Sequence, residues 1–308
     1  MSRVTVLTGG VGGAKLVLGL CHIMKPEQIT AIVNTGDDFS HLGLTVSPDL
    51  DTLLYTLSGK GDTEKGWGRG NETWSFMEAV ASLGGAKWFQ LGDGDLALHV
   101  LRSDALRRGE TLSAITQNFA AAWGVGAKML PMSDDPVATK ITTDEGELDF
   151  QSYFVARRCA PVASAIKFSG AAAARPGPGV LEAIASAETI LIAPSNPYLS
   201  VDPILAVPGI TEALRVAGAP MVAVSPLIGG QSVKGPTAKL MQELGVPLSN
   251  AAIAAHYAGL IDGLLIDTQD AAQNPGIAFA STDTLMRDLE DRKRVAAAAL
   301  AFARTLKA

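Results

Sequence analysis

Paired carboxylates near a helix start are among the residues of this 308-residue chain whose types and spacing could do chemistry. Asp49 and Asp51 lie two residues apart, just before a helical pattern formed by Leu53, Leu54 and Leu57. In an extended approach to a helix, this spacing puts both carboxylates on one side, where they could share a divalent cation or one could act as a base. Alternatively, Asp51 caps the helix and Asp49 is a solvated loop residue.

A run of glycines lies between a short apolar strand at 4–7 and a helical pattern at 14–20. The four are Gly9, Gly10, Gly12 and Gly13. Such a turn aims backbone N–H groups and the positive end of the helix dipole at one spot, which suits a diphosphate. Lys15 stands where the dinucleotide fingerprint has its third glycine, and no Ser or Thr follows it as in a P-loop. We therefore predict a non-standard phosphate loop, the alternative being a tight turn without a ligand. A bulky side chain, as in Gly12→Val, is expected to block binding of the diphosphate ligand while leaving the protein folded.

Polar residues follow several predicted strands at the point where each strand ends. They are Asn34, Thr35, Asp37 and Asp38 after strand 29–33, Ser195 and Asn196 after strand 189–193, and Lys234 and Lys239 in the loops after strand 221–225. Because ligands bind along the carboxyl edge of a parallel sheet, we expect these loops to form one site, with the lysines neutralising a diphosphate. Ordinary turn and loop chemistry is the alternative explanation.

Two further acidic turns are candidate site segments. Asp93 and Asp95 follow a predicted strand at 87–91, and His99 lies one helical turn beyond Asp95, which fits either a metal site or a turn with a helix cap. Ser133 and Asp134 begin the second turn, after a short predicted strand.

The composition narrows the class of protein. A formal net charge of -6 argues against a nucleic-acid partner, which needs a basic face. Cys21 and Cys159 are too few for a disulfide framework and lack metal-ligand spacing, so we expect a reducing, cytoplasmic setting. Neither a secretory signal nor a run of 18 apolar residues occurs, so we expect no membrane association.

The order of predicted elements indicates an α/β fold. We predict a single elaborated domain over 1–308, with a Rossmann-like parallel sheet, helices on both faces and a smaller α+β insertion at approximately 95–170. A hairpin is expected over 141–150, and a last strand over 264–267. A charged helix and an alanine-rich tail helix are expected within 282–308.

Taken together, these loops resemble the 2-phospho-L-lactate transferase family of deazaflavin coenzyme F420 biosynthesis. The resemblance covers roughly residues 1–270, and the motifs occur in the family's order. They span 8–15, 34–38, 47–52, 92–95, 133–136, 195–197 and 235–239. Each motif alone is weak, but the ordered combination is specific.

The resemblance implies a transferase. Family members pass a phosphorylated three-carbon acid from its guanosine diphosphate adduct to the ribityl hydroxyl of 7,8-didemethyl-8-hydroxy-5-deazariboflavin, releasing GMP with the help of magnesium (Mg2+). It implies a nucleotide site at the glycine turn and at Ser195 and Asn196, and deazaflavin and metal contacts around Asp49. Many relatives have Arg or Lys where Gly94 stands, so a cationic contact there must come from elsewhere in this chain.

Such chemistry needs an in-line hydroxyl and charge neutralisation, which clustered Asp residues, backbone N–H groups and lysines would supply. No residue singles out lactate, enolpyruvate or glycerate as the acid. An NAD-dependent oxidoreductase and a non-catalytic nucleotide-sugar-binding regulator of the gluconeogenesis-factor type are the alternatives. A homodimer is the expected oligomer on general grounds.

Overall fold

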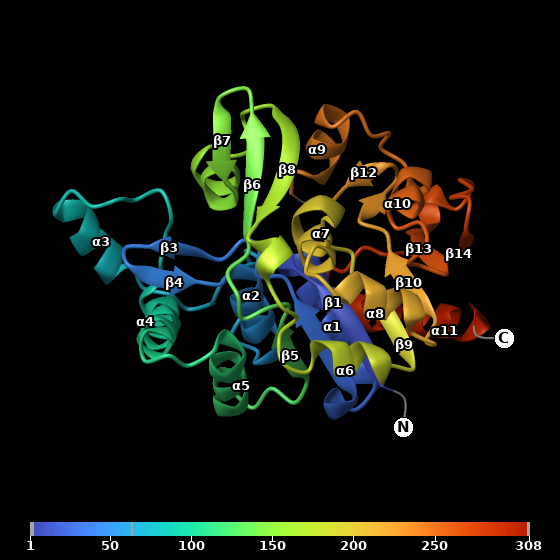
Figure 1. Cartoon of the computed structure of the whole chain (residues 1–308), viewed down its shortest axis with the longest axis horizontal. Helices are drawn as coiled ribbons and strands as arrows, with labels where there is room; N and C mark the ends of the chain where they lie inside the picture. The colour runs from blue at the N-terminus through green and yellow to red at the C-terminus, as the bar shows by residue number, and fades with distance from the viewer. Residues whose placement is uncertain (1–2, 63, 234, 307–308) are drawn as a thin grey trace.

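A seven-stranded parallel sheet forms the centre of the protein (Figure 1), in a computed structural model that describes residues 3–62, 64–233 and 235–306. The strands, in spatial order, are β14 (Ala278–Thr282), β13 (Gly263–Asp267), β10 (Met221–Val224), β9 (Thr189–Ile192), β1 (Val4–Thr8), β2 (Ile29–Val33) and β5 (Lys128–Pro131). Every neighbouring pair is parallel. The predicted parallel sheet is thereby confirmed.

Helices cover both faces of this sheet, because alternate side chains of each buried strand point to opposite faces. Val4 and Val6 of β1 belong to one apolar core, and Leu7 belongs to the other. The first core is closed mainly by α1 (Gly10–Ile23), α2 (Pro48–Leu57), α5 (Leu112–Ala122) and α11 (Leu289–Leu306), and the second by α6 (Val180–Ala185), α8 (Ile210–Val216), α9 (Thr237–Glu243) and α10 (Asn250–His256). This arrangement confirms the Rossmann-like architecture.

A separate three-stranded antiparallel sheet rises from the carboxyl edge, at the top of Figure 1. Its strands are β7 (Gly146–Asp149), β6 (Ala138–Thr143) and β8 (Ala163–Ser169), in that spatial order. The predicted hairpin over 141–150 corresponds to β6 and β7. Within the range 95–170, β5 pairs with β2 in the main sheet, so the separate sheet begins only after β5.

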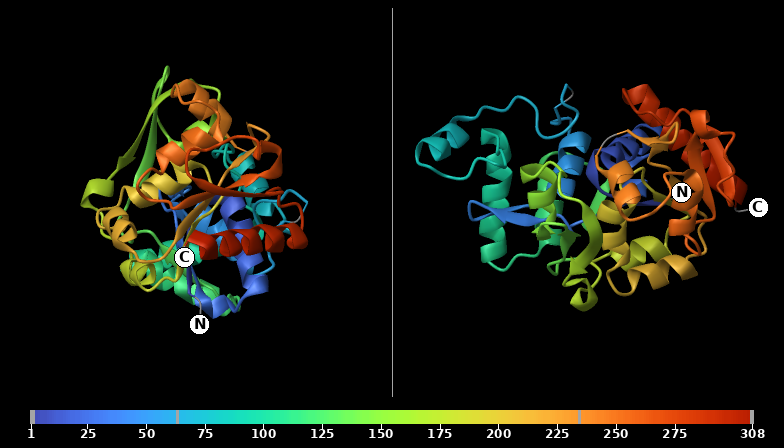
Figure 2. Two further views of the ribbon diagram at one scale, coloured as in Figure 1. Left: turned by 90° about the vertical axis from the view of Figure 1, so that its right-hand side faces the viewer. Right: turned by 90° about the horizontal axis from the view of Figure 1, so that it is seen from above.

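A small lobe lies at the end of the molecule opposite the C-terminus (Figures 1 and 2). It contains the hairpin of β3 (Phe39–His41) and β4 (Leu44–Val46), together with α3 (Ser75–Ser82) and α4 (Asp93–Arg107). The predicted strand at 87–91 is wrong, since this segment is irregular. Leu91 instead buries itself with Val46 and Met77, so local apolar packing replaces strand pairing.

The end of the chain also differs from expectation. β14 adds a parallel strand beyond β13, and one helix, α11, replaces the two expected helices. The chain also contains α7 (Asp202–Leu205), the short hairpin of β11 (Leu227–Ile228) and β12 (Gln231–Ser232), and helical turns at 26–28, 152–156, 171–173, 197–201 and 268–270. Among the described residues, none of the helices is long and apolar enough to cross a membrane.

Candidate active site

The carboxyl ends of β1, β2 and β9 bring three of the predicted loops together. Ser195, after β9, donates a hydrogen bond from Oγ to the carbonyl oxygen of Gly9 (2.7 Å) and accepts one from its N–H (3.3 Å). Asn34, after β2, donates from Nδ2 to the carboxylate of Asp49 (3.0 Å). The glycine turn, the Asn34 turn and the Ser195 loop therefore lie together at this edge, and Asp49 adds the start of α2 to them.

Asp49 is buried against the start of α1. Its Oδ1 accepts a 2.7 Å hydrogen bond from the N–H of Gly10, while Oδ2 faces Asn34. Burial raises the pKa of the Asp49 carboxyl to about 6, and the charge of Asp51 adds to the rise. Only 6% of Asp49 is exposed, so the expectation of a solvated loop residue is wrong.

Asp51 does not share the position of Asp49. The helix already begins at Pro48, so both carboxylates lie in its first turn. Residues two apart in a helix point in directions that differ by roughly 200°, so the two side chains face different ways. Asp51 pairs with the guanidinium of Arg102, with Nη1 3.2 Å from Oδ2. The prediction that both carboxylates face one side is wrong, as is the idea that Asp51 caps the helix, because Ser47 holds the N-cap position.

The turn after β2 adds two more buried carboxylates. The side-chain amide of Asn34 accepts from the N–H of Gly36 (2.7 Å) and donates to Asp37. Asp38 accepts a 2.6 Å hydrogen bond from the hydroxyl of Ser47. Burial first, and the neighbouring Asp charges second, raise the pKa of Asp37 well above its ordinary range. Burial also raises the pKa of Asp38. Together with Asp49 these residues form an acidic cluster, Asp37, Asp38 and Asp49.

Thr35, in the same turn, is also buried. Its Oγ1 has no hydrogen-bond partner among the described residues, although its carbonyl oxygen accepts from the N–H of Asp38 (3.2 Å). Thr35 therefore helps to shape the turn.

The glycines of the first turn are needed for packing within the chain. A Cβ at Gly12 would lie 2.5 Å from the carbonyl oxygen of Pro194, and one at Gly9 would lie 2.5 Å from Oδ2 of Asp49. A Cβ at Gly13 would overlap the hydroxyl of Thr8. Gly12→Val should therefore damage the fold, contrary to the expectation from the sequence.

Lys15 contacts the C-terminal part of the chain. Its ammonium donates a 2.7 Å hydrogen bond to the carbonyl oxygen of Met286, in the segment between β14 and α11. The lysine thus ties α1 to the C-terminal part of the chain.

Asn196 combines a structural contact with an unused donor. Its Oδ1 accepts from the N–H groups of Tyr198 (3.0 Å) and Leu199 (3.1 Å), which caps the helical turn at 197–201. Its Nδ2 is buried and has no partner among the residues that the structure describes. A buried donor without a partner is costly, so this amide is suited to a ligand acceptor.

Four predicted site residues make structural hydrogen bonds instead. Asp93 accepts from the N–H groups that start α3, and Asp95 accepts from the hydroxyl of Tyr55. Ser133 donates to the carbonyl oxygen of Arg175 (2.7 Å), and Asp134 accepts from the N–H of Ser113 (2.7 Å). These contacts hold α3, α4 and α5 in place.

Of the two lysines expected at the diphosphate, Lys239 makes contacts within the chain. The ammonium of Lys239 donates to the carbonyl oxygen of Pro161 (2.8 Å) and the hydroxyl of Tyr153 (3.3 Å), and pairs with Glu243. It therefore links α9 to the segment before β8. Lys234 lies outside the described residues.

Arg69 is a neighbour of Gly94 that sequence reasoning missed. A Cβ at Gly94 would overlap the guanidinium of Arg69, which also contacts Glu72 (2.9 Å). Glu72 in turn accepts from the N–H of Gly94 (2.7 Å). Arg69, from the segment between α2 and α3, thus fills the space that a side chain at position 94 would need. In the sequence, the glycine at position 94 was the signal that a cation from elsewhere could occupy this space.

The acidic cluster could hold magnesium together with phosphate groups of a substrate. No group of three His, Cys, Asp or Glu side chains suited to a metal occurs in the described part of the chain. Asp37 and Asp49 nevertheless share one amide donor, Asn34, and their charges oppose each other in a desolvated site. Magnesium is commonly held by one or two carboxylates together with substrate phosphates. The residues present fit that mode and not a cage built from protein alone.

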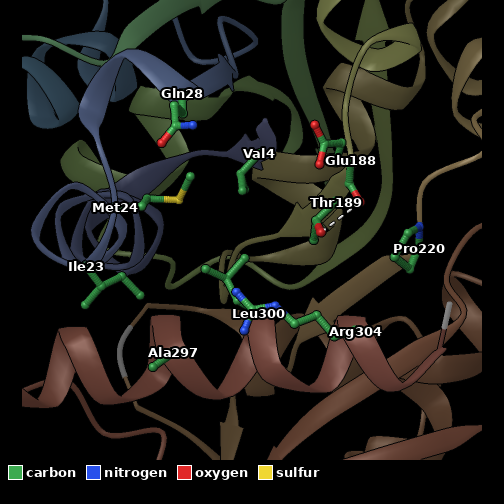
Figure 3. A pocket seen from close by; sticks show the side chains of 10 residues that line it. All are labelled: Val4, Ile23, Met24, Gln28, Glu188, Thr189, Pro220, Ala297, Leu300 and Arg304. Carbon is green, nitrogen blue, oxygen red and sulfur yellow. Dashed lines mark hydrogen bonds between the residues drawn. The ribbon is translucent and has the colours of Figure 1, made fainter. Parts of the chain in front are cut away.

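A hollow of about 480 Å³ lies at the opposite edge of the sheet (Figure 3). Ile23 and Met24 at the end of α1 line it, and Ala297, Leu300 and Arg304 project into it from α11. It is bordered by the amino ends of β1 and β9, so it is separate from the residues described above.

Comparison with known proteins agrees with this picture. A model of the family described as 2-phospho-L-lactate transferase CofD matches residues 4–300. Proteins named phosphoenolpyruvate transferase are 45% identical in Kitasatospora aureofaciens and 44% identical in Streptomyces griseus, in both cases over 99% of this chain and at least 99% of the relative. In Streptomyces coelicolor the identity is 42% over 99% of both chains.

The solved structures support the fold. A crystal structure of a Bacillus halodurans protein has a TM-score of 0.65 at 21% identity, covering 97% of this chain and 99% of the other. A Bacillus halodurans protein described as a member of the UPF0052 family has a TM-score of 0.64 at 20% identity, covering 97% and 98%.

The chain therefore belongs to the 2-phospho-L-lactate transferase CofD family. The family and the names of the relatives support an enzyme, a transferase in the biosynthesis of coenzyme F420.

Proposed function

We propose that this protein transfers a phosphorylated three-carbon acid from its guanosine diphosphate adduct to the ribityl hydroxyl of 7,8-didemethyl-8-hydroxy-5-deazariboflavin, releasing GMP. We propose the enolpyruvyl adduct as the donor, because relatives with 42% to 45% identity are named phosphoenolpyruvate transferase. The observation that carries the proposal is the buried carboxylate of Asp49, which accepts a hydrogen bond from the start of α1, in a chain of this family.

In this reaction, the oxygen of the ribityl hydroxyl forms a bond to the phosphorus that carries the three-carbon acid. The bond from that phosphorus to the GMP oxygen breaks, and the hydroxyl loses its proton to solvent or to a carboxylate. The protein contributes position and charge, with little covalent chemistry of its own. Asp49, at the meeting point of α1, α2 and the turn after β2, is the residue we assign to the reacting groups.

The nucleotide part of the donor is assigned to the loop after β9. The unpartnered Nδ2 of Asn196 is a donor for a phosphate or base oxygen, and Ser195 holds this loop against the glycine turn. The acceptor is assigned to the side of α2 and the lobe, near Asp49 and the start of α4.

Asp49 and Asp37 are the residues that would hold magnesium. When bound, the ion would neutralise negative charge on the diphosphate. Asn34 positions both carboxylates through one side-chain amide, so it sets the distance between them.

Product mass tests the proposal directly. The purified protein is incubated with the deazaflavin riboside and, in separate reactions, with the lactyl, enolpyruvyl and glyceryl guanosine diphosphate adducts, with magnesium or with a chelator. We expect a product whose mass equals that of the riboside plus phosphoenolpyruvate minus one water, equimolar GMP, and no product with the chelator. A protein that binds the donors but forms no adduct with any of them would contradict the proposal and favour a regulator.

A further inference from the structure

Arg102 is a buried cation next to the acidic cluster. It lies on α4, and only 2% of it is exposed. Its guanidinium makes two contacts with the carboxylate of Asp51, which lies 51 positions earlier in the chain. Nη1 also donates to the carbonyl oxygen of Thr45 at 3.3 Å. Arg102 therefore joins α4, α2 and β4 at one point.

A second layer of buried groups supports this contact. Nδ1 of His99 lies 3.4 Å from Nη1 of Arg102 and 3.7 Å from Oδ2 of Asp51. Nε2 of the same ring lies 3.1 Å from the carboxylate of Asp95, which also accepts from the hydroxyl of Tyr55. The network alternates between side chains of α2 and α4, so it defines how these two helices sit against each other.

The first turn of α2 is thus held from two sides. Asp49 attaches it to the N–H of Gly10 and to Asn34 in the parallel-sheet core. Asp51 attaches it to Arg102 in the lobe. This turn therefore connects α4 to Asp49 through two side chains, Arg102 and Asp51.

We propose that Arg102 is a positioning residue for the transfer reaction, which acts through Asp51 to fix the first turn of α2 and hence the carboxylate of Asp49. The inference rests on the proposed function. It assigns Asp51 to Arg102 and removes it from the metal and catalytic groups. A buried ion pair of this kind gains little net stability over apolar packing, whereas it fixes geometry closely.

A double-mutant cycle tests the coupling. The variants are Asp51→Asn, Arg102→Gln and the double variant, in which two neutral amides face each other. We expect each single change to lower kcat by about tenfold or more, and the loss in the double variant to be about tenfold smaller than the product of the two single losses. The donor KM should stay within about threefold of the parent value, because the nucleotide part of the donor, which we assign to the loop after β9, is not altered.

Arg108→Gln is the matched control at the C-terminal end of the same helix, because Arg108 pairs with Asp104 on the exposed surface. Its kcat should equal that of the parent. If the single losses multiply in the double variant, and Asp51→Asn alone raises the magnesium requirement, Asp51 is a metal ligand and the proposal is wrong.

A conservative variant guards against unfolding. Arg102→Lys keeps the charge and one contact, so we expect it to recover most of the turnover that Arg102→Gln loses. Equal turnover in the two variants would contradict the proposal.

Hydrogen exchange separates this inference from the proposed function. We expect the amides of residues 10–13 and 48–52 to exchange faster in Arg102→Gln than in Arg108→Gln, whichever substrate the parent uses. If the parent forms no product but Arg102→Gln still shows the faster exchange, the proposed function is refuted and the positioning role of Arg102 stands. Unchanged exchange at both segments would refute the positioning role.

Discussion

The carboxylate of Asp49 accepts a 2.7 Å hydrogen bond from the backbone N–H of Gly10, at the first turn of α1. Negative charge is favoured at a helix N-terminus, so Asp49 occupies one of the groups that the glycine turn offers to a phosphate. A donor phosphate that approaches the same turn meets a like charge. We infer that the two anions are brought together only when a proton or a cation compensates one of them.

Asp49→Asn is expected to lower turnover by about 100-fold or more, the loss typical of one electrostatic contact at a reacting centre. The amide keeps the shape of the side chain and an acceptor for Gly10, so the variant should remain folded at the assay temperature. Steady-state product formation at saturating magnesium and a thermal melt provide the measurements. Turnover within about threefold of the parent, equivalent to about 0.7 kcal/mol of barrier, would return Asp49 to a purely structural role.

The carboxyl of Asp49 should also make the free energy of unfolding depend on pH. Its pKa is about 6 in the folded protein against 3.8 in the unfolded chain, so between these values the folded state binds more protons. The free energy of unfolding of the chelator-treated parent should therefore fall relative to that of Asp49→Asn as the pH rises from about 4 to about 6, and the difference should level off above that range. Asp37 and Asp38 also have raised pKa values, but they are present in both proteins, so the difference reports on Asp49.

Urea titrations of both proteins at several pH values measure this difference. Parallel curves for the parent and Asp49→Asn across the range would show that Asp49 titrates normally in the folded state.

Gly12→Ala should destabilise the fold. The new Cβ would lie 2.5 Å from the carbonyl oxygen of Pro194, a backbone atom that cannot turn aside, and overpacking of this kind costs about 1–3 kcal/mol. Gly218→Ala is the matched control, because a Cβ there meets no atom within 4 Å. Thermal melts compare the two. Equal melting temperatures for Gly12→Ala and the parent would mean that the turn can open, as expected of a loop shaped only for a ligand.

Asn196→Ser should weaken donor binding selectively. Ser can cap the helical turn at 197–201 about as well as Asn, but it lacks the buried Nδ2 donor. One lost hydrogen bond corresponds to about a tenfold higher Kd for a guanosine diphosphate analogue. Calorimetry measures that affinity, and a spectral titration with the deazaflavin riboside should give the parent value. A larger loss of riboside affinity than of nucleotide affinity would reverse our assignment of the two halves of the site.

Structural features that depend on residues adjacent in the chain could be predicted from the sequence. The buried run of β1 followed by glycines, and the turn after β2 beginning at Asn34, are local patterns, and their order along the chain indicated both the parallel sheet and the family. Their convergence follows from a general property of parallel sheets, whose strands all end at the same edge.

Contacts between side chains far apart in the sequence were decided only by the tertiary structure. Asp51 resembles Asp49 in the sequence, but the rotation of α2 turns it toward Arg102 of α4. Lys239 lies in a predicted phosphate loop, but its ammonium is taken up by groups near β8. Gly12 suggested room for a ligand, whereas the carbonyl oxygen of Pro194 fills that space. A residue's type and spacing limit the chemistry that it can do, and packing from distant segments decides which atoms are left to do it.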